Sequence, residues 1–136
     1  MSASPNKPCP CKSGKKYKKC CRVYHYGRPA ESAVILMRSR YSAYAVGEVD
    51  YIMATTHPAS PHRLQDEQRW RAEIARFCDQ TAFLDLTIHE EEEAPMEAHV
   101  RFTATLKQGG EDASFTEDSR FLSVDGQWRY LAAIVP

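Results

Sequence analysis

The sequence predicts an α+β fold in which three helices pack on one face of a curved four-strand antiparallel sheet, preceded by a small zinc knuckle. Two periodicities indicate this order. Apolar residues recur every three or four positions between residues 30 and 77, as on one face of a helix. From residue 81 they alternate with polar residues, as in half-buried strands. Four of the five cysteines lie ahead of both regions, within residues 9–21.

These features divide the 136-residue chain into three parts, one of them a domain large enough to bury a core. Residues 1–8 are small, polar and proline-containing, so we expect a disordered lead. Residues 9–28 are expected to form the knuckle and a connector, and residues 29–136 the α+β domain. With 43% hydrophobic and 26% charged residues, the composition is that of an ordinary globular protein.

The helices are expected over residues 30–46, 48–54 and 64–77. The first begins after Pro29 and ends at Gly47, a residue that readily adopts the left-handed conformation found after helix C-termini. Its apolar stripe consists of Val34, Met37, Tyr41 and Tyr44. Pro58 and Pro61 interrupt the chain between the second and third helices, because proline cannot continue a helix.

The strands are expected over residues 81–89, 100–106, 113–124 and 128–134. Four consecutive glutamates followed by Ala94-Pro95 predict a turn over residues 90–95. Asp125-Gly126 predicts a type I′ hairpin between the last two strands. The alternation of the third strand is irregular around Asp118, which predicts a β-bulge there.

The knuckle is predicted from the pattern Cys9-x-Cys11-x-Ser13-Gly14-x5-Cys20-Cys21. Four thiolates complete a tetrahedral shell for zinc, and the glycine allows the turn that brings the two cysteine pairs together. A disulfide framework and an iron–sulfur cluster are the alternatives. A reducing cytosol argues against disulfides, and a bond between the two vicinal cysteines would close a strained ring. Zinc comes first among the metals because tetrahedral sites made only of sulfur select it.

The net charge of zero hides a division between the two ends of the chain. Residues 1–40 hold ten Lys and Arg and one Glu, whereas residues 41–136 hold eight Lys and Arg and seventeen Asp and Glu. A basic head on an acidic body favours an anionic partner for the head. Alternatively, the lysines between the cysteines only stabilise the neighbouring thiolates.

The cysteine pattern resembles the SEC-C motif, a short zinc module at the C-terminus of the SecA translocation ATPase and in many other bacterial proteins. The resemblance implies that zinc is ligated by Cys9, Cys11, Cys20 and Cys21. In SecA the module is associated with docking of the acidic chaperone SecB and with the ribosome. By analogy this chain is an adaptor for an acidic protein surface, the ribosome or RNA. The candidate partner-binding residues are Lys15, Lys16, Tyr17, Lys18 and Lys19, with the Tyr17 ring available to stack on a base.

A second pattern lies in residues 37–45 (MRSRYSAYA) and 54–58 (ATTHP). It resembles the YchJ family, small bacterial proteins with an N-terminal SEC-C motif and a nuclear-transport-factor-2-like domain. The resemblance implies a cone-shaped α+β barrel with a pocket between helices and sheet, and no particular reaction. The candidate pocket residues are Arg38, Tyr41, Tyr44 and His57. The bland alternative is that the tyrosines are core aromatics, the arginine faces solvent and the histidine belongs to a turn.

Two classes of function therefore remain, an adaptor and a small-molecule binder or enzyme of the isomerase or dehydratase kind. A third alternative is that zinc only stabilises the knuckle and the domain is an accessory without activity of its own. The sequence lacks a P-loop, a dinucleotide-binding glycine pattern and a serine-nucleophile elbow, so we expect an adaptor rather than an enzyme. No apolar run approaches the ~20 residues of a membrane span, and the N-terminus lacks the apolar core of a signal peptide. The expected location is the cytoplasm, and the expected state is a monomer or a homodimer.

Overall fold

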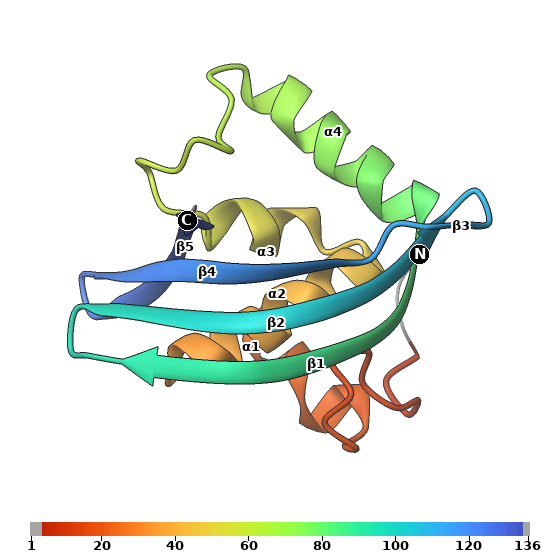
Figure 1. Ribbon diagram of the computed structural model, residues 1–136, viewed down its shortest axis with the longest axis horizontal. Helices are drawn as coiled ribbons and strands as arrows, with labels where there is room; N and C mark the ends of the chain where they lie inside the picture. Colours follow the sequence, from red (N-terminus) through yellow and green to blue (C-terminus); the bar gives the residue numbers. More distant parts are fainter. Residues whose placement is uncertain (1–3, 135–136) are drawn as a thin grey trace.

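The computed structural model describes residues 4–134, in which helices cover one face of an antiparallel sheet (Figure 1). The helices are η1 (Tyr17–Lys19), α1 (Cys21–His25), α2 (Ala33–Val46), α3 (Val49–Ala54) and α4 (Glu67–Gln80). The strands are β1 (Thr81–Glu93), β2 (Glu97–Gln108), β3 (Glu111–Asp112), β4 (Phe115–Val124) and β5 (Gln127–Ala133). The predicted α+β fold is confirmed. The short helices η1 and α1, within the N-terminal segment, are additional to the three predicted.

The main strands follow the order β1-β2-β4-β5, and neighbours pair in antiparallel fashion, with β3 attached to β2. Within residues 4–134, β1 and β5 do not pair, so the sheet is curved but open and not the closed barrel that the resemblance implies. Asp125 and Gly126 have φ angles of 51° and 79°, as the predicted type I′ hairpin requires. The irregularity predicted around Asp118 lies further along β4, between Arg120 and Phe121.

Strand β1 is longer than predicted because its glutamates continue to pair with β2. Glu93 pairs with Ala98, so the turn is confined to residues 94–96. A carboxylate oxygen of Glu93 also accepts a hydrogen bond from the backbone nitrogen of Ala33 at 2.8 Å. This contact satisfies one of the free donors at the start of α2 and ties that helix to the end of the sheet.

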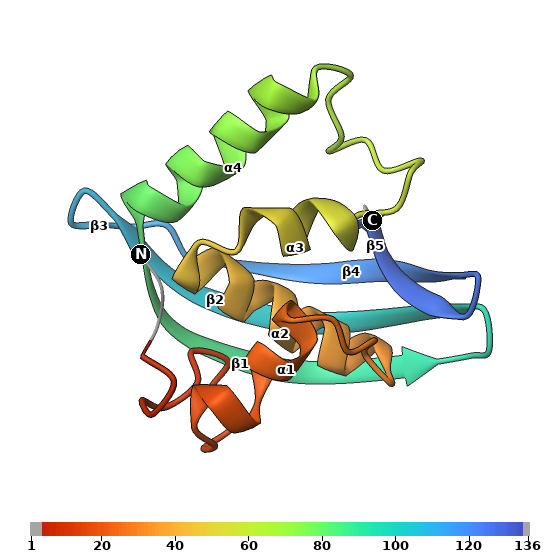
Figure 2. The same cartoon turned by 180° about the vertical axis from the view of Figure 1, so that it is seen from behind.

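Helix α2 is capped at both ends by residues that the sequence indicates. Ser32 Oγ accepts a hydrogen bond from the backbone nitrogen of Ile35 at 3.2 Å, and Gly47 follows the helix with a φ of 78°. The helix is buried on more than the single stripe predicted. Leu36 packs in the core with the sheet, whereas Val46 packs with the clustered cysteines. Helix α2 therefore forms a middle layer between the sheet and the N-terminal segment (Figure 2).

The core between α2 and the sheet comes mainly from one side of β2. Its buried residues are Ala98, Val100, Phe102, Ala104 and Leu106. They pack with Phe121 of β4, Trp128 of β5 and the sheet-facing residues of α2. Helix α4 is amphipathic and buries only Trp70 and Ile74, so much of it lies beyond this core (Figure 1). It begins later than predicted because the Asp66 carboxylate accepts the backbone N–H of Arg69 at 3.1 Å and caps it.

The N-terminal segment is more ordered than the sequence indicates. Residues 1–3 lie outside the described residues, but residues 4–8 pair with the segment that carries the cysteines. The backbone nitrogens of Tyr17 and Lys18 donate to the carbonyls of Lys7 and Pro5, each at 2.9 Å. The disordered lead predicted for residues 1–8 is therefore corrected for residues 4–8.

Candidate functional site

The four clustered cysteines converge on one point beside α2. Their sulfur atoms all lie within 4.8 Å of one another, with Cys11 and Cys20 at 3.6 Å and Cys20 and Cys21 at 4.0 Å. A zinc ion with Zn–S bonds of about 2.3 Å holds tetrahedral sulfur atoms roughly 3.8 Å apart. The observed separations fit that shell, and all five cysteines of the chain are free thiols. The cluster thus has the donor set and geometry of a metal site.

The loop between the two cysteine pairs positions these sulfurs. Gly14 adopts a φ of 88°, and the backbone nitrogen of Cys9 donates to the carbonyl of Lys15 at 2.9 Å across the turn. Hydrogen bonds from the thiols of Cys21 and Cys9 hold the pKa of Cys11 well below its ordinary value. Burial raises the pKa of Cys20 to about 11. The protons shared among these thiols are those that a bound cation displaces.

The cysteine cluster is docked against α2 rather than attached by a loose connector. Cys9 Sγ lies 3.3 Å from Ser42 Oγ, and Arg38 Nη1 donates to the carbonyl oxygen of Cys11 at 2.8 Å. Arg38 therefore supports the knuckle, which corrects its placement in the pocket.

A buried hydrogen-bond chain holds the other side of the knuckle. Tyr17 OH lies 2.6 Å from His25 Nδ1, and His25 Nε2 lies 2.7 Å from the carbonyl oxygen of Ser39 on α2. Because a carbonyl can only accept, Nε2 carries the proton and the tyrosine hydroxyl donates to Nδ1. Burial lowers the pKa of His25, which favours this neutral form. Tyr17 is only 4% exposed, which corrects the expectation that its ring is free to stack on a base.

The lysines around the cysteine cluster are exposed to solvent. The exposed side chains are Lys12, Lys15, Lys16, Lys18 and Lys19. Within residues 4–134, no carboxylate oxygen lies within 4.0 Å of any of their amines. The knuckle therefore combines a buried sulfur interior with an unpaired basic exterior.

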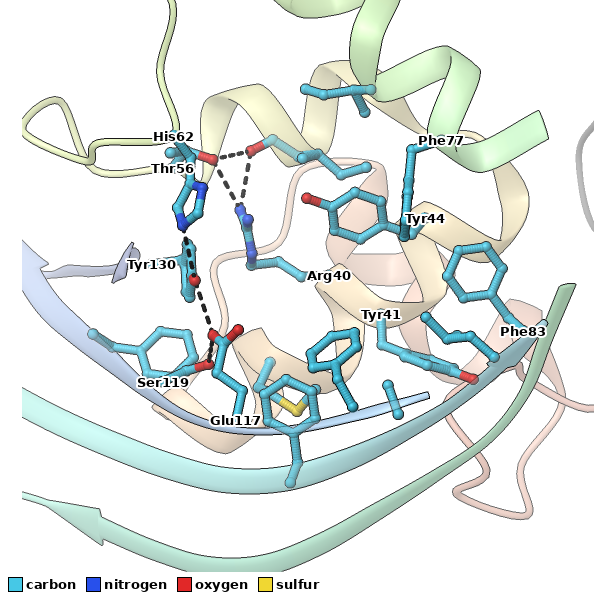
Figure 3. A pocket seen from close by; sticks show the side chains of 18 of the residues that line it. Arg40, Tyr41, Tyr44, Thr56, His62, Phe77, Phe83, Glu117, Ser119 and Tyr130 are labelled. Carbon is cyan, nitrogen blue, oxygen red and sulfur yellow. Dashed lines mark hydrogen bonds between the residues drawn. The ribbon is translucent and has the colours of Figure 1, made fainter. Parts of the chain in front are cut away.

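A second candidate site is a cavity of about 370 Å³ between the sheet and helices α2, α3 and α4. Most of its wall is apolar, formed by Met37, Ile52, Ile74, Phe77, Phe83 and Phe102 among others. Polar groups gather at one corner, where α2, the loop after α3 and strands β4 and β5 meet (Figure 3). An apolar wall with a few convergent polar groups is typical of small-molecule sites.

Arg40 is the central group of this polar corner and is 7% exposed. Its Nη1 donates to Thr55 Oγ1 at 2.7 Å and to the Ile52 carbonyl at 3.0 Å, and its guanidinium lies 4.7 Å from the centre of the Tyr130 ring. Tyr130 OH in turn donates to a carboxylate oxygen of Glu117 at 2.9 Å. Burial raises the pKa of Tyr130, so this hydroxyl stays protonated.

Family sequence models match both the segment with the cysteine cluster and the domain with the cavity. A sequence model described as "YchJ, middle NTF2-like domain" matches residues 32–133, which is most of the chain. The chain belongs to the YchJ family. A second model, that of the SEC-C motif, matches residues 6–22 and includes all four clustered cysteines.

Relatives of this YchJ-family chain match it over nearly its full length. A UPF0225 protein of Deinococcus radiodurans is 39% identical over 131 residues, covering 95% of this chain and 90% of the relative. Another UPF0225 protein, from Pectobacterium carotovorum, is 40% identical over 133 residues, covering 93% and 82%. The solution structure of a SEC-C motif-containing protein from Rhodopseudomonas palustris is similar with a TM-score of 0.79 at 31% identity, covering 96% of this chain and 99% of the other.

Two of the four candidate pocket residues line the cavity. Tyr41 and Tyr44 form part of its wall. The Tyr41 hydroxyl donates to the Asp85 carbonyl at 2.9 Å, and burial raises the Tyr41 pKa to about 12. His57 lies instead in the loop after α3, where its Nδ1 accepts the backbone N–H of Ala59 at 2.9 Å. This contact fits the alternative interpretation of His57 as a residue that stabilises a turn.

The sequence did not indicate the cavity residues Glu117 and Tyr130. Glu117 carried a usable signal, because it shares the phase of Ser119 and Phe121 on β4 and a glutamate on the inward side of a strand is unusual. Within residues 4–134, no helix is both long enough and apolar enough to cross a membrane.

Proposed function

We propose that this YchJ-family protein is a zinc-binding adaptor that docks an acidic protein surface through its SEC-C knuckle. One observation carries the proposal, namely a group of exposed, unpaired lysines on a knuckle held rigidly against α2. The lysines are Lys15, Lys16, Lys18 and Lys19. A positively charged surface of this kind steers an acidic partner and fixes its orientation.

Zinc is the metal that best suits the cysteine cluster. Four cysteine sulfurs within 4.8 Å of one another form a closed shell with no open position for a substrate. Closed sulfur-only shells are typical of structural zinc. In this role the metal stabilises the knuckle, and the docked contacts of Arg38 and His25 transmit that order to α2.

An acidic protein is favoured over single-stranded RNA because Tyr17 is buried. Recognition of single strands relies on exposed aromatic rings on which bases stack. The exposed aromatic ring of this region is Tyr26, which is 70% exposed and is covered on one face by Arg22, whose guanidinium carbon lies 4.7 Å from the ring centre. Val23 is also exposed nearby. Tyrosine and arginine are the residue types enriched at the energetic centres of protein interfaces.

Site-specific photo-crosslinking in cells tests the adaptor proposal. A photoreactive residue at Lys18 should give a protein adduct that survives nuclease and is lost at high salt. The matched control is the same residue at Lys107, an exposed lysine on β2, which should give no such adduct. A variant with Lys15, Lys16, Lys18 and Lys19 changed to glutamate should retain its zinc and lose the partner.

Two results would contradict this proposal. Adducts that disappear with nuclease would indicate RNA or the ribosome instead of an acidic protein. Equal labelling from positions 18 and 107 would show that the knuckle is no more a docking surface than the sheet. Zinc measured on each purified variant separates loss of docking from loss of the metal.

A second candidate function is binding, or conversion, of a small molecule in the cavity. The supporting observation is the cavity of about 370 Å³ with Arg40, Glu117 and Tyr130 at one corner. Ligand pockets typically measure about 300–1,000 Å³. In an enzyme of the isomerase or dehydratase kind, Glu117 and Tyr130 would serve as the acid–base pair. Ala104→Phe, which places a ring in the cavity, should abolish any rise in Tm that small amphiphiles cause in the unmodified protein.

A further inference from the structure

Arg40 forms no direct ion pair in the described part of the chain. Within residues 4–134, no carboxylate oxygen lies within 4.0 Å of its guanidinium nitrogens, although the residue is only 7% exposed. Hydrogen bonds to Thr55, Thr56 and the Ile52 carbonyl are all made by Nη1. A buried cation without an anion is unfavourable, and buried charges are usually paired.

The other donors of Arg40 remain available from the cavity. Among the described residues, no fully buried side-chain nitrogen or oxygen lacks a hydrogen-bond partner. Within residues 4–134, the hydrogen bonds of Arg40 to the loop after α3 leave Nε and Nη2 unused, with the Tyr44 hydroxyl as the polar group near the guanidinium; these two nitrogens are not fully buried, and Arg40 lines the cavity. Two adjacent N–H groups on one side of a guanidinium match the two oxygens of a carboxylate.

The carboxylates that border the cavity are both held by other residues. Glu117 accepts hydrogen bonds from Tyr130 OH and Ser119 Oγ. Glu73 forms an ion pair with Arg69 at 3.5 Å on the exposed side of α4. Neither of them lies within 4.0 Å of the guanidinium of Arg40, so among the described residues no direct ion pair forms and the position suits the anion of a ligand.

The rest of the cavity specifies the remainder of that ligand. Aliphatic and aromatic side chains form the wall beyond the polar corner, including Met37, Ile52, Ile74, Phe77 and Phe102. The Tyr44 hydroxyl points from α2 towards Arg40 (Figure 3), and burial raises its pKa, so it remains a donor at neutral pH. A charged head at Arg40 is therefore followed by space that favours an apolar body.

We propose that the cavity binds an amphiphilic monocarboxylate, with the carboxylate on Arg40 Nε and Nη2 and the apolar chain or ring against the α2, α4 and β2 side chains. This inference rests on the second candidate function, that the cavity is a small-molecule site. It adds the chemical class of the ligand and the residue that selects it. Glu117 opposes the ligand's charge and limits its affinity.

Calorimetric titration of the full-length protein with octanoate and with octanol tests the inference, because the two probes share an apolar chain and differ in head group. Octanoate should bind at least about tenfold more tightly, since hydrogen bonds to a charged group are worth more than neutral ones. Arg40→Met keeps the apolar part of the side chain and should remove that preference without weakening octanol. Glu117→Gln should strengthen octanoate binding by several-fold and leave octanol unchanged, and it does not alter the buried arginine.

Isoleucine methyl NMR locates the bound chain. Ile52 and Ile74 line the cavity, whereas Ile35 of α2 lies outside it and serves as the internal control. Octanoate should give nuclear Overhauser contacts to the methyls of Ile52 and Ile74 and none to Ile35. This pattern excludes binding of the anion to the exposed lysines of the knuckle.

The possible results separate the carboxylate assignment from the second candidate function, on which it rests. Equal affinity for octanoate and octanol in the cavity would overturn the carboxylate assignment and leave a site for neutral molecules. Octanoate contacts away from Ile52 and Ile74 would also overturn the assignment. Absence of binding by both probes up to millimolar concentration would overturn the inference together with the second candidate function.

Discussion

Removing the metal should unfold the knuckle and destabilise the domain without unfolding it. The core between α2 and the sheet contains none of the clustered cysteines, so it survives when the knuckle detaches. Detachment exposes Val46 and breaks the hydrogen bonds from Arg38 to Cys11 and from His25 to Ser39. Exposing the valine costs about 1.5–3 kcal/mol, and each hydrogen bond about 0.5–1.5 kcal/mol.

These contributions give a loss of about 4 kcal/mol in the free energy of unfolding of the domain. A domain of this size loses roughly 4 °C in Tm for each kcal/mol, so the expected fall is about 15 °C. Amide hydrogen exchange with and without a strong chelator provides the spatial test. The amides of Cys9, Tyr17 and Cys20, which are hydrogen-bonded within the knuckle, should lose protection, while those of β2 and β4 keep it.

A matched pair of substitutions controls the chelation experiment. Cys20→Ser should abolish metal binding and reproduce the exchange pattern. Cys78→Ser, the same change in the one cysteine outside the cluster, should leave the metal content unchanged. Simultaneous loss of protection in β2 and the knuckle would refute the reasoning, because the domain would then depend on the metal for its fold. An unchanged Tm after metal loss would also refute the reasoning, because it would show that the knuckle does not stabilise the domain.

Three further predictions concern single residues. Ser32→Ala should lower the free energy of unfolding by about 1 kcal/mol in urea denaturation, because it removes the N-cap of α2, and Thr87→Ala on the outer side of the sheet is the control. Tyr17→Phe should cost about 1–3 kcal/mol in the same assay by leaving His25 Nδ1 without its buried donor, and an unchanged midpoint would contradict the assigned tautomer. The pKa of His99 is raised because of its hydrogen bonds to Glu92 and Asp118. The protonated form of His99 therefore stabilises the fold below about pH 6.5, and this contribution disappears as the pH rises through the folded-state pKa. His99→Gln should therefore be destabilising at pH 5.5 and neutral at pH 9, and a loss that is equal at both pH values would refute the charge interpretation.

Local signals in the sequence predicted the elements and one of the two sites. Ser32 and Gly47 bound α2 because capping depends on neighbouring residues alone. The cysteine cluster was predictable for the same reason, since two pairs in thirteen residues can meet through one turn. The glutamates of β1 were misassigned to a turn because their pairing with β2 is a tertiary contact.

The polar corner of the cavity could not be predicted because it comes from distant segments. Arg40, Glu117 and Tyr130 are brought together by the crossing of α2 with β4 and β5. Periodicity predicted a single apolar stripe on α2 and not two covering layers, so it could not assign Arg38 to the knuckle and Arg40 to the cavity. Tyr17 was misjudged likewise, because a ring among lysines is buried only once the knuckle docks.

Because α2 contacts both the cysteine cluster and the cavity, insertions and deletions within this helix are restricted. Successive residues of a helix are about 100° apart, so inserting or deleting one residue rotates everything beyond it by that angle. An insertion between Arg38 and Arg40 would move Arg40, Tyr41 and Tyr44 out of the cavity and carry Ser42 away from Cys9. The length of this helix between Ser32 and Gly47 therefore cannot vary without dismantling both sites.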